Sequence, residues 1–159
     1  MLKHITEEQI NELKTIADAE YKFAQRSYKK ICNEIAAQEP SCGLITELAG
    51  YNTAASLWGM VVTMIELNET PSSTIGEIVS SLSSEYGQWK RDHRATGTTS
   101  LMRNALNAVE ADSKIHNIRR IVGVIVETMD TTSVKSRREF QEEIETKILS
   151  SSKTFGSAL

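Results

Sequence analysis

Hydrophobic residues recur at steps of three or four over the first part of the chain, the spacing that places side chains on one face of an α-helix. Thr6 and Gln9 have the spacing of a capping box, which marks a helix start. Pro40 disfavours helical geometry at the residue before it. The pattern predicts a helix from about residue 6 to 38, about 45–50 Å long at 1.5 Å per residue. Its apolar stripe consists of Ile10, Leu13, Ala17, Tyr21, Ala24, Tyr28, Ile31 and Ile35.

The next segment, from about residue 44 to 67, carries apolar residues on nearly every helical face. Such a helix is expected to be surrounded by others, so we predict that it is the central helix of the fold. Residues 48–65 contain no charge, but their flanks are acidic rather than basic, which favours a buried helix over a membrane span. Gly50 leaves open whether the segment is one helix or two.

Three further helices are expected, over about residues 74–93, 99–129 and 136–149. Capping boxes at Thr74 and Ser136 mark two of the starts, and a polar patch inside the middle one indicates a kink or an exposed turn at 110–114. The sequence therefore predicts an all-α, single-domain bundle of about five helices: four long helices plus a shorter C-terminal helix. The domain is expected over residues 1–149, followed by a mobile tail over residues 150–159.

Composition agrees with a globular helical domain. The chain has 159 residues, 40% of them hydrophobic and 25% charged, with two prolines and eight glycines, and this scarcity of helix breakers favours long helices. Cys32 and Cys42 flank the first proline, and we expect reduced thiols there, although a disulfide between them stays open. The N-terminal residues lack an apolar leader, so a cytoplasmic location is expected.

Charge changes sign along the chain. Residues 1–87 carry six basic and twelve acidic residues, whereas residues 88–140 carry ten basic and six acidic residues. Two halves of opposite charge can attract each other within one fold, attract a second copy, or leave the basic half free for an anionic partner. Trp89 lies beside the first basic cluster, where it could stack on a base. The candidate residues for binding a nucleic acid or an acidic partner are Lys90, Arg91, Arg94, Arg103, Arg119, Arg120, Lys135, Arg137 and Arg138.

The other interpretation of these basic residues is structural. Lysine and arginine near a helix end interact favourably with the helix dipole, and they can pair with the acidic first half of the chain. The chain as a whole is acidic, and no helix-turn-helix or RNA-binding signature is visible. We therefore favour the structural interpretation over the nucleic-acid surface.

No catalytic or metal-binding motif accompanies the charge pattern. His4, His93 and His116 are scattered, and the sequence contains no Cys-x-x-Cys, no Glu-x-x-His, no phosphate-binding glycine loop and no Gly-x-Ser-x-Gly elbow. The sequence therefore predicts no metal site, no cofactor and a non-enzymatic protein, and an enzyme without a recognisable local motif stays open as a third, weaker alternative.

One segment near the end of the chain resembles a known family. Ile125-Val126-Glu127, followed by Arg137-Arg138-Glu139-Phe140-Gln141, is similar to the helix and the Arg-x-x-Phe-Glu segment of rod-shaped plant virus coat proteins. Gln141 stands where that family has an acidic residue. The resemblance covers residues 125–141 and implies a small helical subunit that polymerises around RNA.

These observations predict a non-enzymatic helical protein that acts through protein–protein contact, by self-assembly or as an adaptor or inhibitor of a larger partner. The first helix is long enough to project beyond its neighbours, in which case its apolar stripe would need a second chain. The alternative is a helical nucleic-acid-binding or viral coat-type subunit that uses a basic surface formed by residues 88–140. No membrane partner is expected.

Overall fold

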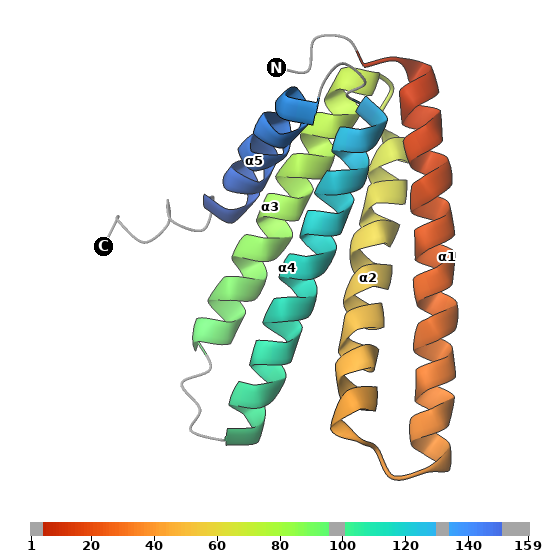
Figure 1. The fold of residues 1–159 in the computed structure, drawn as a ribbon, viewed down its shortest axis with the longest axis vertical. Helices are drawn as coiled ribbons and strands as arrows, with labels where there is room; N and C mark the ends of the chain where they lie inside the picture. The colour runs from red at the N-terminus through yellow and green to blue at the C-terminus, as the bar shows by residue number, and fades with distance from the viewer. Residues whose placement is uncertain (1–4, 96–100, 130–133, 151–159) are drawn as a thin grey trace.

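The computed structural model describes residues 5–95, 101–129 and 134–150, and within them every regular element is a helix. The chain forms an all-α bundle of four long helices and a shorter C-terminal one, as the hydrophobic pattern predicts (Figure 1). The helices are α1 (Glu7–Ala37), α2 (Cys42–Leu67), α3 (Pro71–Ala95), α4 (Leu101–Met129) and α5 (Val134–Ser150).

The helices lie side by side, with α1 at one edge of the bundle and α5 at the other (Figure 1). α1 packs mainly on α2, and α5 packs on α3 and α4. α4 contacts each of the other four helices. α2 contacts α1, α3 and α4, so the central position predicted for the second helix is shared with α4, whose sequence is less hydrophobic.

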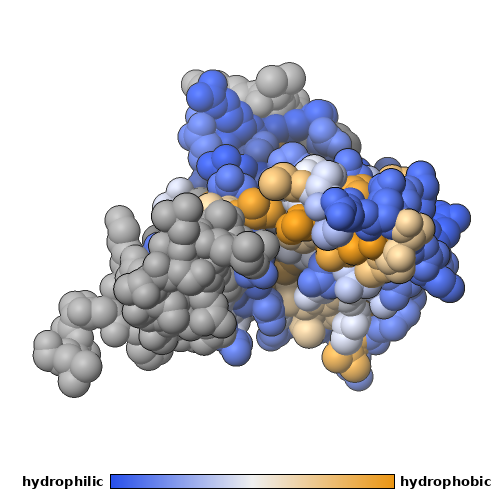
Figure 2. Space-filling view, turned by 90° about the horizontal axis from the view of Figure 1, so that it is seen from below, coloured by the Kyte–Doolittle hydropathy of each residue, from blue (hydrophilic) through white to orange (hydrophobic). Residues whose placement is uncertain are grey.

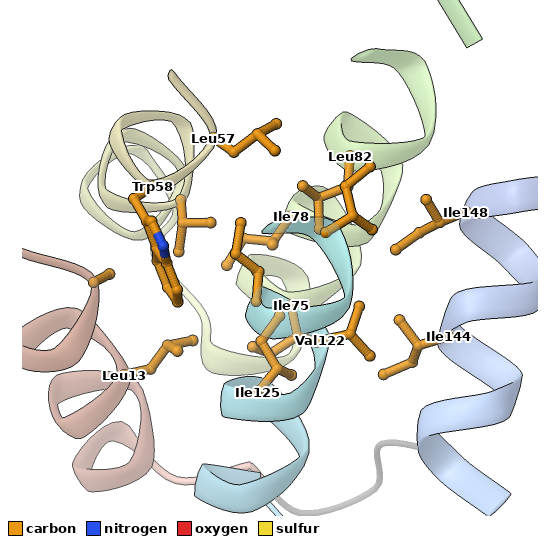
Figure 3. Packing of buried hydrophobic residues seen from close by; sticks show 14 of the residues in the cluster. Leu13, Leu57, Trp58, Ile75, Ile78, Leu82, Val122, Ile125, Ile144 and Ile148 are labelled. Atoms are coloured by element: carbon orange, nitrogen blue, oxygen red, sulfur yellow. The ribbon is translucent and has the colours of Figure 1, made fainter. Parts of the chain in front are cut away.

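One core gathers buried residues from all five helices (Figure 3). Leu13, Trp58, Ile78 and Ile125 are fully enclosed, and Ile144 of α5 completes the set. Most of these residues lie toward the upper end of the bundle in Figure 1, where α5 covers the other helices. Burying an aliphatic side chain of this size stabilises the fold by about 1.5–3 kcal/mol, so this end holds the helices together.

α1 begins where the capping box predicts. The backbone nitrogen of Gln9 donates to Thr6 Oγ1 at 3.2 Å, and the Gln9 side chain accepts from the backbone nitrogen of Thr6 at 2.9 Å. Both bonds satisfy backbone donors that the first helical turn would otherwise leave free. The helix ends at Ala37, before the proline.

The apolar stripe of α1 faces its own chain. Five of its eight predicted members are buried, whereas Tyr28 is exposed. α2 runs antiparallel beside α1 and covers this line, so the stripe needs no second chain. The buried members are Ile10, Leu13, Ala17, Ala24 and Ile31.

Two predicted helix caps and one predicted exposed turn differ from the structure. α3 begins at Pro71, where a proline suits the first helical turn, and Thr74 is buried inside it, with its hydroxyl donating to the backbone oxygen of Thr70 at 2.9 Å. α5 begins at Val134, ahead of the predicted cap. No turn interrupts α4 at residues 110–114. α2 is likewise one helix through Gly50.

Leu57 and Leu67 offer a matched test of this core, because both lie on α2 but their exposed fractions are 1% and 71%. Leu57→Ala is expected to lower the free energy of unfolding by about 2–5 kcal/mol, since it leaves a cavity among packed side chains. Leu67→Ala is expected to change it by less than about 0.5 kcal/mol. Urea denaturation of the two variants measures the difference, and equal effects would contradict the described packing.

Gly50 and Gly59 test the continuity of α2. A Cβ at Gly50 meets nothing within 4 Å, whereas one at Gly59 would lie 3.0 Å from the ring of Tyr21. Gly50→Ala is expected to stabilise the protein by about 0.5–1 kcal/mol, because alanine favours a continuous helix. Gly59→Ala is expected to be less stable than Gly50→Ala, since the Tyr21 ring must move. Thermal unfolding compares them, and destabilisation by Gly50→Ala would argue for a break in the helix.

Candidate interaction surface

The predicted basic residues lie at separate levels of the bundle. Lys90, Arg91 and Arg94 lie near the C-terminal end of α3, and Arg103 lies near the start of α4, at the lower end in Figure 1. Arg119 and Arg120 lie sixteen and seventeen residues further along α4, about 24 Å away at 1.5 Å per residue. Lys135, Arg137 and Arg138 lie at the start of α5, at the upper end.

For four of these nine residues the structure describes the helical backbone only; these are Arg91, Arg94, Arg103 and Lys135. Among the others, Lys90 lies over the ring of Tyr86, with Nζ at 5.7 Å from the ring centroid. Trp89 packs against the same ring at 5.8 Å and against the core, so its ring is half-buried rather than presented to solvent.

Three of the four arginines of the candidate set whose side chains are described form ion pairs within the chain. Arg120 Nη2 lies 2.7 Å from Glu20 of α1, and Arg119 Nε lies 4.0 Å from Glu145 of α5. The two neighbours therefore point to opposite sides of α4. Arg138 pairs with Glu142 on its own helix at 3.0 Å.

Arg137 differs from these arginines. Its Nε is buried without a hydrogen-bond partner among the residues that the structure describes. The side chain as a whole is half-buried. The described side chains of the set thus point in different directions and contact different helices, and they form no continuous basic face.

A second charged surface, which the comparison of the two halves of the sequence missed, lies on the outer face of α1. Residues 7–20 carry five acids and one lysine, whereas residues 22–30 carry four basic residues and no acid. Summing charge over residues 1–87 hides this reversal. A window of one or two helical turns would have found it, because residues three or four apart are neighbours on a helix.

The outer stripe of α1 is the line of residues at steps of three or four on the side of the helix opposite its buried face. Every member is exposed to solvent, and the first two are acidic while three of the last four are basic. Figure 1 shows that α1 lies at the edge of the bundle, so this stripe faces away from the other helices. Its members are Glu8, Glu12, Thr15, Ala19, Lys22, Arg26, Lys30 and Asn33.

The outer stripe contains little internal charge pairing. Lys30 lies 3.7 Å from Glu34, and this long pair involves a lysine side chain that is 77% exposed. Arg26 Nε donates to the backbone oxygen of Lys22 at 3.2 Å, which leaves its terminal nitrogens available. Within the described residues, Glu8 and Glu12 form no ion pair. The outer stripe thus carries its acidic residues on one half of the helix and its basic residues on the other.

An apolar hollow of about 200 Å³ lies beside this stripe, between α1, α2 and α4. Phe23 is 50% exposed at its rim and contacts Tyr51 edge to face, with 6.0 Å between the ring centroids. The Glu20–Arg120 pair closes another side. Seen from the lower end, apolar residues gather in the middle of the surface, while the edge where α1 lies is mainly polar (Figure 2).

No group of three or more metal-ligating side chains occurs in the described residues. Cys32 and Cys42 are free thiols, and a side-chain hydrogen bond with Cys32 raises the pKa of Tyr28 above its usual value. Among the helices as described, none has the combined length and hydropathy that a bilayer span requires.

Over residues 5–95, 101–129 and 134–150, these observations define an all-α bundle of five helices, in which the acidic and basic residues of α1 lie in separate blocks. Comparison with protein-family models, with curated proteins and with solved structures finds no match for this chain.

The Glu20–Arg120 contact predicts a measurable link between α1 and α4. In a double-mutant cycle with Glu20→Gln and Arg120→Gln, the coupling energy is expected to be about 0.5–1 kcal/mol and to fall with added salt. The solvent-exposed Arg138–Glu142 pair is the control and is expected to give about 0.3–0.5 kcal/mol. Urea denaturation of each variant supplies the free energies. A zero coupling for Glu20–Arg120 would mean that Arg120 is available to another partner.

Proposed function

We propose that this chain is a non-enzymatic helical protein that acts through protein–protein contact, by assembling with copies of itself. The observation that carries the proposal is the outer stripe of α1, which is exposed along its whole length and has opposite charges on its two halves. A surface whose positive and negative charges lie in separate blocks is complementary to the same surface of a second copy.

The hollow beside the stripe supports the same function. Phe23 is a large aromatic residue that is half exposed at the edge of the stripe, and aromatic residues of this kind are enriched at protein interfaces. The charged residues that line the hollow include Glu20, Glu47 and Arg120. Arg120 and Glu20 already neutralise each other. Binding, rather than catalysis, is therefore the better supported use of this region.

The alternative, a nucleic-acid-binding or coat-type subunit, stays a prediction from the basic residues and from the resemblance over residues 125–141. The described arginines of residues 88–140 that face other helices are engaged by Glu20 and Glu145, so binding of phosphates there would compete with existing pairs. An adaptor or inhibitor role on a larger protein is the other form of the main proposal. The cytoplasmic location expected from the sequence also stays a prediction.

Mass in solution separates these possibilities. We expect the full chain to sediment at a multiple of its 17.7 kDa mass, with association that strengthens with protein concentration and weakens from about 50 to 500 mM salt. Single-stranded RNA and DNA oligonucleotides are expected to leave the mass unchanged.

Two results would contradict the proposal. A monomer at all concentrations would exclude self-assembly and leave the adaptor or inhibitor form. A complex with RNA that dissociates steeply with salt would favour the nucleic-acid alternative, and the Arg119/Arg120 and Arg137/Arg138 pairs would then be neutralised in turn.

A further inference from the structure

We infer that the partner of the outer stripe is the same stripe of a second copy, packed antiparallel about a two-fold axis that passes Ala19. This inference rests on the proposed self-assembly and specifies its geometry. In an antiparallel pair centred on Ala19, Glu8 lies level with Lys30 of the partner subunit, and Glu12 lies level with Arg26 of the partner subunit. The two-fold axis repeats each pair, so four opposite-charge contacts form along one helix pair.

The middle of the stripe suits close helix packing. Thr15 and Ala19 are small and exposed, which lets two helix axes approach to about 8–10 Å. The Thr15 hydroxyl already donates to the backbone oxygen of Asn11 at 2.9 Å, so its burial leaves no polar group unsatisfied. Phe23 lies level with Thr15 of the partner subunit in this register.

The charges select this arrangement over others. In a parallel pair Glu8 would face Glu8 of the partner subunit and Arg26 would face the partner's Arg26, and like charges in contact oppose association. A nucleic acid on the basic half would leave the acidic half of the same face repelling its phosphates. A second copy uses both halves, so it fits the stripe better than a polyanion does.

The bundle leaves room for this packing. α1 lies at one edge and α5 at the other, so two copies joined through α1 carry their remaining helices on opposite outer sides (Figure 1). The residues that bury the inner face of α1 do not take part, and the fold is not disturbed. One helix pair is a small interface, so its charge contacts account for much of its specificity.

Charge reversal tests the register. Glu12→Arg and Arg26→Glu each convert two symmetry-related attractions into repulsions, and each is expected to weaken self-association at least about tenfold. Combining both substitutions in one chain exchanges the signs and is expected to restore it. An equimolar mixture of the two single variants is expected to form a heterodimer, because both of its pairs are again opposite in charge.

Glu77→Arg is the control, since Glu77 is exposed on α3 and the substitution changes net charge by the same amount as Glu12→Arg. It is expected to leave association unchanged. Sedimentation equilibrium of each variant gives the dissociation constant, and circular dichroism reports that each variant is folded. If the wild type assembles but all variants assemble equally well, the antiparallel pairing is wrong while self-assembly stands. If the wild type is monomeric, both the antiparallel pairing and the proposed self-assembly are wrong.

Cross-linking tests the symmetry axis directly. In a Cys32→Ser, Cys42→Ser background, Ala19→Cys is expected to form a covalent dimer with itself under mild oxidation, because the two thiols meet at the axis. Thr15→Cys is expected to link to Phe23→Cys of a second variant rather than to itself. Preferential self-linking of Thr15→Cys would indicate a parallel pair and would overturn the inference.

Discussion

The packing of α4 against all four of its neighbours is the contact on which the bundle depends. Ile118, Ile121, Val122 and Ile125 are almost fully enclosed, and together they line the centre of the core. Each of the outer helices needs only one apolar face to join this centre. Because α4 meets neighbours on several sides, α1 and α5 can lie at opposite edges of the same body.

This arrangement explains why α1 has a free face. Its inner line is buried against α2, so the side chains on the opposite side make few contacts with the rest of the chain. The cost of exposing charged residues there is small, since water solvates them well. Two blocks of opposite charge can therefore persist on one helix without pairing, and they remain available to a second molecule.

Much of the helical pattern could be predicted because it depends on local interactions. The Thr6 capping box and the three-and-four spacing of the α1 stripe involve residues a few positions apart, and both are present in the structure. The capping box predicted at Thr74 is absent, because the helix has already begun at that residue. Thr74 is buried and hydrogen-bonded inside α3, which begins three residues earlier at Pro71. The same local pattern suits a helix start or an interior turn.

The candidate basic surface shows what could not be predicted from the sequence. The sequence contains every arginine of residues 88–140, but it does not contain the partners, because Arg120 meets Glu20 across one hundred positions of the chain. The sequence by itself determined the class of fold, the number of helices and the charges that they carry, since periodicity and capping are properties of neighbouring residues. Only the tertiary structure decided which helix is central, which charges neutralise each other and which face of α1 remains exposed. These features depend on how helices that are far apart in the sequence pack around one core.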